Sequence, residues 1–215
     1  RDFLYANRTT LIVAVILFLA AVGGTIWYRE HKQAQVGRQV EDLAKVYRQL
    51  GEGKTDQAAA LKKLEDSSSA SVVATARFTT AAINLETGKT KEATDIYRAL
   101  AADTDLPPPY RDIALLRQTA LEFDRLKPEE VIARMQPLAK PGESWFGSAA
   151  EMTALALIKQ GKKQEAGRLF AAIARDKTAP EILRARSVQI ASSLGVDASD
   201  ALNASALAGA PASAQ

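Results

Sequence analysis

A run of uncharged and mostly apolar positions, Thr9–Tyr28, dominates the hydropathy pattern near the start of the chain. As an α-helix, a run of this length is about 30 Å long, which matches the hydrocarbon thickness of a bilayer. Arg8 precedes the apolar core, and Trp27, Tyr28 and Arg29 lie at its other end, where interfacial side chains are favoured. The pattern predicts one transmembrane helix at 9–28 after a short flank at 1–8.

A cleavable secretory signal is the alternative interpretation of this run. Ala21-Val22-Gly23 is compatible with a small-residue cleavage site, but the apolar core is longer than that of a usual signal and a polar helical pattern follows it directly. The basic residues on the two sides, Arg1 and Arg8 against a slightly larger number after the run, do not decide the orientation of a span.

Beyond the run, apolar residues recur at three- and four-residue spacing, which is typical of amphipathic helices. Ala is abundant, β-branched residues are sparse, and Gly and Pro separate the periodic stretches. We predict helices at Thr9–Leu50, Asp56–Asp66, Ser71–Thr87, Lys91–Ala102, Tyr110–Arg125, Glu129–Leu138, Trp145–Gln160, Lys163–Arg175 and Pro180–Leu194.

A short motif recurs between consecutive helices of this prediction. Gly53-Lys54 begins one copy, Gly88-Lys89 a second and Gly161-Lys162 a third, and each is followed at the same distance by an alanine. The first two copies are 35 residues apart, and the gap before the third leaves room for a degenerate copy at Leu126. A period near 34 residues with a glycine between two helices is typical of tetratricopeptide repeats.

The spacing within each copy explains why the copies are expected to stack. Gly adopts the positive φ that ends a first helix, and Ala58, Ala93 or Ala166 lets the second helix approach closely. Tyr97, Met135 or Phe170 then fills the space between hairpins, while Lys62 breaks the pattern in the first copy. Since each hairpin leaves an apolar face for its neighbour, we predict an all-α solenoid of helical hairpins over 29–196.

The last part of the chain, 197–215, is rich in Ala, Ser, Gly and Pro and contains few large apolar side chains. Such a composition does not offset the entropy of ordering, so we predict a flexible tail there. Composition also limits the chemistry. The net charge is only +3, there is no dense basic block, and there are no cysteines, so neither nucleic-acid binding nor a thiolate metal site is expected.

Catalysis has no candidate residues in this sequence. His31 is the only histidine, and it lies among basic residues beside the apolar run. No serine has a second histidine to activate it, and no phosphate-binding or dinucleotide-binding motif occurs. We therefore predict a protein that is not an enzyme and that needs no cofactor.

The first helix of each hairpin is the expected source of a protein-binding surface. Trp145 opens the first helix of the last full repeat, where it is either a packing residue between repeats or an anchor for a partner. Several residues of the predicted surface belong instead to the core, and the sequence does not separate the two groups. The candidates are Thr75, Phe78, Leu85, Glu86, Ile113, Leu116, Phe123, Trp145, Glu151, Leu155 and Lys159.

The order of these parts resembles the YfgM-like family, ancillary subunits of the bacterial SecYEG translocon. The resemblance extends from the apolar run to the last helix and is sharpest at Gly142–Trp145 and from Ala154 through Gly161-Lys162 to Ala166. It implies a single-pass inner-membrane protein with its body in the periplasm. It further implies contact with the translocon and with a membrane-anchored, parvulin-like periplasmic chaperone, and it brings no catalytic residues. An accessory or assembly role in another inner-membrane complex, such as a respiratory one, remains the alternative.

Overall fold

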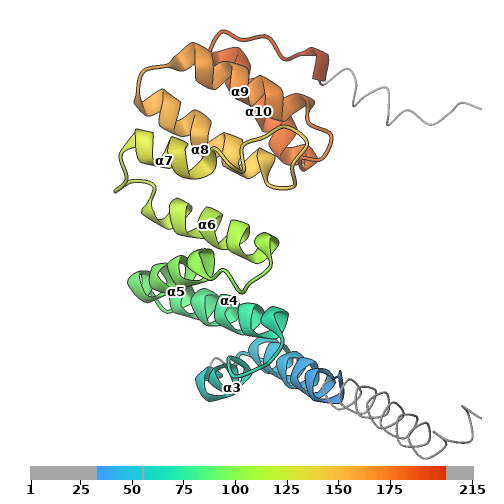
Figure 1. Ribbon diagram of the computed structural model, residues 1–215. Helices are drawn as coiled ribbons and strands as arrows, with labels where there is room; N and C mark the ends of the chain where they lie inside the picture. The colour runs from blue at the N-terminus through green and yellow to red at the C-terminus, as the bar shows by residue number, and fades with distance from the viewer. Residues whose placement is uncertain (1–32, 55, 202–215) are drawn as a thin grey trace, which may run out of the picture. The chain divides into compact units, whose positions relative to one another are not determined.

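The computed structural model describes residues 33–54 and 56–201, and all regular structure in these ranges is helical. Residues 33–51 form the first described helix, called here the first helix. It is followed by α3 (Ala58–Leu64), α4 (Ala70–Glu86), α5 (Thr90–Ala102), α6 (Pro108–Glu122), α7 (Pro128–Met135), α8 (Phe146–Lys159), α9 (Lys163–Arg175) and α10 (Glu181–Ser193) (Figure 1). The all-α prediction is confirmed for this part of the chain.

The predicted helices between 56 and 194 are all present, with ends within three residues of those predicted. The predicted span Thr9–Tyr28, its interface residues Arg8, Trp27, Tyr28 and Arg29, and the flank at 1–8 lie outside the described residues. Among the residues that are described, no helix is both long and apolar enough to cross a bilayer.

The described residues separate into two compact units, whose boundary lies within α4, between Thr80 and Ala81. In the N-terminal unit, Val46 of the first helix and Leu61 and Leu64 of α3 are buried, as are Val72 and Ala74 of α4. The hydroxyls of Tyr47 and Thr79 are 3.0 Å apart, so a hydrogen bond joins the first helix to α4.

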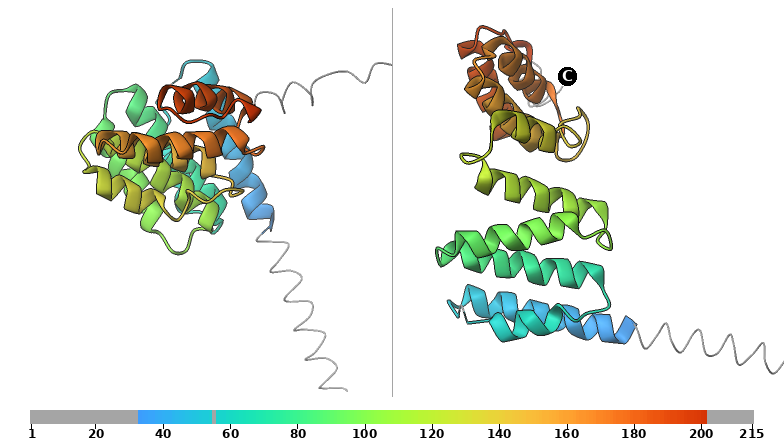
Figure 2. Two further views of the ribbon diagram at one scale, coloured as in Figure 1. Left: turned by 90° about the horizontal axis from the view of Figure 1, so that it is seen from above. Right: turned by 60° about the vertical axis from the view of Figure 1, so that its left-hand side comes forward.

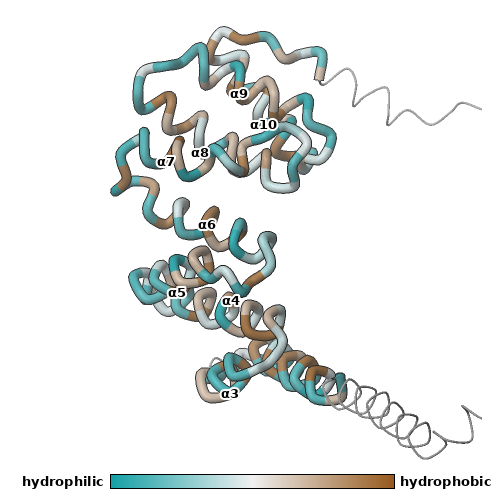
Figure 3. The backbone as a smooth tube through the Cα atoms, viewed as in Figure 1, coloured by the Kyte–Doolittle hydropathy of each residue, from teal (hydrophilic) through white to brown (hydrophobic). Residues whose placement is uncertain are grey.

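In the C-terminal unit, consecutive helices lie side by side: α5 packs on α6, α7 on α8, α8 on α9 and α9 on α10. The connections α4–α5, α6–α7 and α8–α9 lie along one edge of this unit (Figures 1 and 2). Apolar and polar positions are interspersed along the helices (Figure 3), and α5, α7 and α9 are clearly amphipathic, with one buried side. One core cluster of this unit forms around Phe146 and Phe170, and another forms around Val131 and Met135.

The repeated glycines end their helices in the predicted left-handed conformation. Gly53, Gly88 and Gly161 have φ between 76° and 78°. In each case the amide of the next residue donates to the carbonyl five residues earlier, at 2.7–2.9 Å, which is the Schellman arrangement. Gly195, with φ 79°, makes the same turn 34 residues after Gly161, so the repeat turn also occurs at the end of α10.

The first copy of the repeat differs from our prediction. In the other second helices the buried triplets are Ala93, Tyr97 and Leu100; Val131, Met135 and Leu138; and Ala166, Phe170 and Ile173. In α3 the buried triplet is Gln57, Leu61 and Leu64, whereas Ala58 is exposed. The prediction that Ala58 mediates close helix approach is therefore wrong: the connection after Gly53 is one residue shorter, which also explains why Lys62 broke the pattern.

The packed part of the chain also extends beyond the predicted boundary at residue 196. Ala198 is buried in the cluster around Phe170, and both carboxylate oxygens of Asp200 accept hydrogen bonds from Arg175 at 2.8 Å. The Arg175 guanidinium holds the pKa of the Asp200 carboxyl below its usual range. The prediction of a flexible segment is therefore wrong for residues 197–201, and residues 202–215 lie outside the described part.

Replacing Gly161 with Ala is expected to lower the free energy of unfolding by about 1–2 kcal/mol, because an L-residue is strained in the left-handed region. The new methyl group meets no atom within 4 Å, so the backbone conformation alone accounts for the loss. Urea unfolding of the full chain in detergent measures it. The matched control is Gly37→Ala in the first helix, where space is also open and helix propensity predicts a gain of about 0.5–1 kcal/mol. Equal shifts in the same direction would contradict the explanation.

Candidate functional site

A stripe of side chains along α8 is presented on the surface of the C-terminal unit. Glu151, Leu155 and Lys159 follow one another at four-residue spacing, so they lie on one face of the helix. Leu155 is 40% exposed, although its neighbours Ala154 and Ala156 are fully buried. The helix therefore turns a large aliphatic side chain toward solvent in the middle of this stripe.

The residues at both ends of the stripe form ion pairs with residues of other helices or at their ends. The Glu151 carboxylate accepts a hydrogen bond from the guanidinium of Arg186 in α10. The Lys159 ammonium lies 3.0 Å from the Asp124 carboxylate and 4.3 Å from the centroid of the Phe123 ring, both at the end of α6. Exposed pairs of this kind contribute about 0–1 kcal/mol each, so their main effect is to orient the side chains around Leu155.

The same surface continues on α10. Ile182 is 83% exposed and lies one helical turn before Arg186. Two exposed aliphatic side chains, Leu155 and Ile182, thus flank the pair between Glu151 and Arg186. We call the surface formed by these four residues, with Lys159, Phe123 and Asp124, the α8–α10 face.

A partly buried carboxylate fixes the end of α6 that supports this face. Glu122, whose side chain is 12% exposed, accepts hydrogen bonds from Arg98 of α5 and Arg134 of α7 at 2.6 Å and from Gln118 at 3.0 Å. Burial alone would raise the pKa of the Glu122 carboxyl, but the bonds from Arg134, Arg98 and Gln118 outweigh it and hold that pKa below its usual range. Three helices therefore meet at one charged group beside Phe123.

The structure brings four of the predicted surface residues together: Phe123, Glu151, Leu155 and Lys159. Leu116, in contrast, is only 6% exposed and packs with Val131 and Met135, so it belongs to the core. The physical reason is its position on the side of α6 that faces the apolar cluster.

The other candidates of the C-terminal unit are less exposed or lie apart from the stripe. Ile113 and Leu85 are half-buried, and Glu86 is exposed at the end of α4. Trp145 is half-buried and packs against the cluster around Met135, which favours the packing alternative over a partner anchor.

Thr75 and Phe78 belong to the N-terminal unit and do not form part of the α8–α10 face. Both are half-buried, and the Thr75 hydroxyl donates to the Ser71 carbonyl oxygen at 2.7 Å within its own helix.

Sequence analysis missed Ile182 and Arg186 as surface residues. The signal was available, because Arg186 follows Glu151 at 35 residues, the same distance that separates Lys159 from Asp124. The predicted surface ends with the last full repeat, so it includes no residue of α10. Within the described ranges, no three or more His, Cys, Asp or Glu side chains gather where a metal ion would bind.

Comparison with known families gives one match. A family model described as a tetratricopeptide repeat-like domain matches residues 1–191. Searches of curated proteins and of solved structures find no match to the chain.

Proposed function

Because this chain belongs to the tetratricopeptide repeat-like domain family, we propose that it binds other proteins through the α8–α10 face. Domains of this family mediate protein–protein interaction, and the described residues form the expected helical hairpins. The observation that supports this surface is the exposure of Leu155 between two oriented ion pairs. Binding of this kind involves no covalent step and no cofactor.

The chemistry of the face favours a partner with apolar side chains. Burying a large aliphatic side chain is worth about 1.5–3 kcal/mol, so Leu155 and Ile182 supply the affinity. The charged groups around these two side chains, including Lys159 and Arg186, determine which partner binds and in which orientation more than they add affinity. The expected partner segment places apolar residues over these two side chains and polar residues at the rim.

The more specific part of the proposal concerns the place of action. The apolar run Thr9–Tyr28 would tether the domain to a bacterial inner membrane, with the body in the periplasm. There the domain would assist the Sec translocon and a membrane-anchored periplasmic chaperone in handling translocated proteins. The apolar run and the resemblance of Gly142–Lys162 to the YfgM-like family support this proposal.

Site-specific photo-crosslinking in native membranes tests the partner. A photoreactive residue in place of Leu155 is expected to capture translocon or chaperone subunits, whereas the same residue at Arg168, exposed on α9, is not. Capture of a respiratory subunit at fixed stoichiometry would replace the translocon assignment. Identical products from both positions would contradict binding through the α8–α10 face.

Protease accessibility tests the orientation. If the body lies in the periplasm, it is degraded in cells whose outer membrane has been permeabilised and is protected in intact cells. Digestion only in inverted membrane vesicles would place the body on the cytoplasmic side and contradict the proposal.

Replacing Leu155 with Arg is expected to weaken partner binding at least about tenfold, which corresponds to about 1.4 kcal/mol. The side chain is already exposed, so the helical circular dichroism and the unfolding midpoint should stay unchanged. Titration against the crosslinked partner measures the effect, with Arg168→Ala as the control. Wild-type affinity in the Leu155→Arg variant would exclude Leu155 from the interface.

A further inference from the structure

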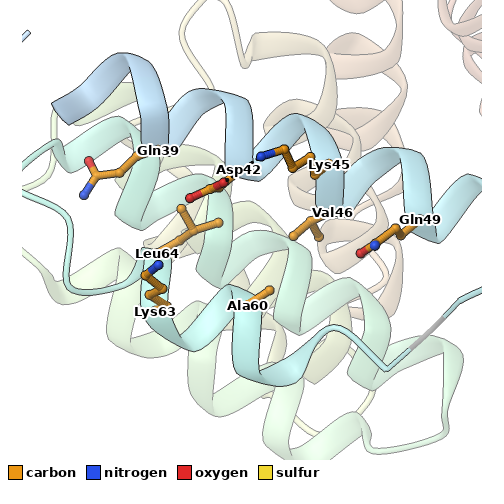
Figure 4. Close-up of a pocket in the computed structure, with 8 residues that line it drawn as sticks. All are labelled: Gln39, Asp42, Lys45, Val46, Gln49, Ala60, Lys63 and Leu64. Carbon is orange, nitrogen blue, oxygen red and sulfur yellow. Dashed lines mark hydrogen bonds and ion pairs between the residues drawn. The ribbon is translucent and has the colours of Figure 1, made fainter. Parts of the chain in front are cut away.

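The first helix and α3 enclose a groove within the N-terminal unit. It has a volume of 290 Å³ and is formed by side chains of these two helices (Figure 4). The buried side chains of Val46 and Leu64 line it, together with the exposed Ala60 and polar side chains of both helices. The lining residues are Gln39, Asp42, Lys45, Val46, Gln49, Ala60, Lys63 and Leu64.

The repeat explains why space is left at this point. When the buried triplets of the second helices are aligned, Ala60 occupies the position held by Ile96 in α5, Arg134 in α7 and Leu169 in α9. Leu169 packs against the core, and Arg134 reaches Glu122 in the partner helix of its own hairpin. The other three hairpins have a long side chain at this position, and the first hairpin has only the methyl group of Ala60. The groove is therefore the space that the missing side chain would fill.

The two lysines that line the groove, Lys45 and Lys63, differ in their surroundings. The Lys45 ammonium is neutralised by Asp42 at 3.3 Å and Glu41 at 3.8 Å. Lys63 is exposed, and no carboxylate of the described residues forms an ion pair with it. Within the described part of the chain, an incoming group thus meets apolar side chains and the unpaired ammonium of Lys63.

We propose that this groove binds a segment of a partner protein that inserts one branched aliphatic side chain beside Ala60 and places a carboxylate near Lys63. The lining of the first helix runs from Gln39 to Gln49, which is about 15 Å of helix and matches about five residues of extended chain. The volume lies just below the range of about 300–1,000 Å³ that is typical of small-molecule pockets, which favours a side chain over a whole small molecule as the occupant. The site is additional to the α8–α10 face and is independent of it.

Fluorescence anisotropy with labelled short peptides tests the proposal on the full chain in detergent. The peptides contain a central Leu or Ala, flanked by Glu or by Lys, in a Gly/Ser background. The Leu/Glu peptide is expected to bind at least about tenfold more tightly than the other combinations. Equal binding of the Leu and Ala peptides, or no binding by any of them, would overturn the proposal.

Two variants locate the binding to the groove. Ala60→Leu restores the missing side chain and is expected to weaken binding of the Leu/Glu peptide at least about tenfold without lowering the unfolding midpoint. Lys63→Glu is expected to shift the preference from Glu-flanked to Lys-flanked peptides. The matched control is Ala59→Leu, one residue along α3, exposed and outside the groove lining, which should bind as wild type.

Three results would count against the assignment. Wild-type binding in Ala60→Leu would exclude the groove, and equal loss in Ala59→Leu would indicate a general effect of changing α3. Sedimentation velocity adds the third: a concentration-dependent dimer that Ala60→Leu abolishes would identify a second copy of this chain, rather than a partner segment, as the occupant.

Discussion

Replacing Phe170 with Ala is expected to lower the free energy of unfolding by about 3–5 kcal/mol, the range for deleting a fully buried aromatic side chain. Phe170 is fully buried in a core cluster of the C-terminal unit, where it packs among side chains of α8, α9 and α10 together with Phe146 and Ile173. The loss combines the transfer of the ring to water with the cavity that the rigid surroundings leave behind.

Urea unfolding of the full chain in detergent, followed by circular dichroism, measures this change. Ile182→Ala is the control, since an 83% exposed side chain should change the free energy by no more than about 0.5 kcal/mol. A Phe170→Ala loss below about 1 kcal/mol would mean that α8 and α9 repack around the missing ring, which is incompatible with a close-packed hairpin.

Removing the carboxylate of Glu122 by Glu122→Ala should cost about 1.5–3 kcal/mol, the range for a hydrogen bond to a charged group. The substitution leaves the guanidiniums of Arg98 and Arg134 without their common acceptor. Arg98 is half exposed, so its ion pair with Glu122 adds little to the free energy of unfolding. Arg98→Ala should therefore lose less than about 1 kcal/mol. Chemical denaturation of both variants tests the order, and an equal or larger loss in Arg98→Ala would contradict it.

The pH dependence of the same site has a definite sign. Since the pKa of Glu122 is lower in the folded protein, its stabilisation is complete above the pKa of the unfolded chain, about 4.3. The stabilisation is lost as the pH falls through the lower folded pKa. The difference in unfolding free energy between wild type and Glu122→Gln should therefore shrink below about pH 4. A difference that grows with acidity would show that Glu122 is stabilised in its neutral form.

Helix positions were predictable because local signals agree with the fold. The prolines near 107–109 and at Pro128 lie where helices begin, and the repeated glycines lie where they end. The register of the first hairpin was not predictable in this way. Whether Gln57 or Ala58 faces the neighbouring helix depends on the length of one connection, and both residues are compatible with either position.

Composition misled the prediction at the C-terminal end. Small residues after Leu194 suggested a segment unable to offset ordering entropy. Ala198 nevertheless fits against the core, and Arg175 reaches Asp200 across 25 residues of sequence. A small side chain packs well where two helices leave only a small space between them. The size of that space depends on the tertiary packing and could not be predicted from the sequence.

The candidate surface was predictable in kind but not residue by residue. Helical spacing placed Glu151, Leu155 and Lys159 on one face, and the structure agrees. The same spacing also selected Leu116, because a helix that packs on two neighbours has more than one apolar side, and only the packing decides which side is covered. Arg186 lies one repeat period after Glu151, so extending the repeat into the last helix would have indicated it.

The turn at Gly195 gives the chain a natural splice point. A duplicate of residues 161–194 inserted there would join two identical glycine turns, so the added module would meet the geometry that α9 meets now. The length of the scaffold is thus adjustable in whole units, by recombination or by an engineer, without redesign of what precedes it.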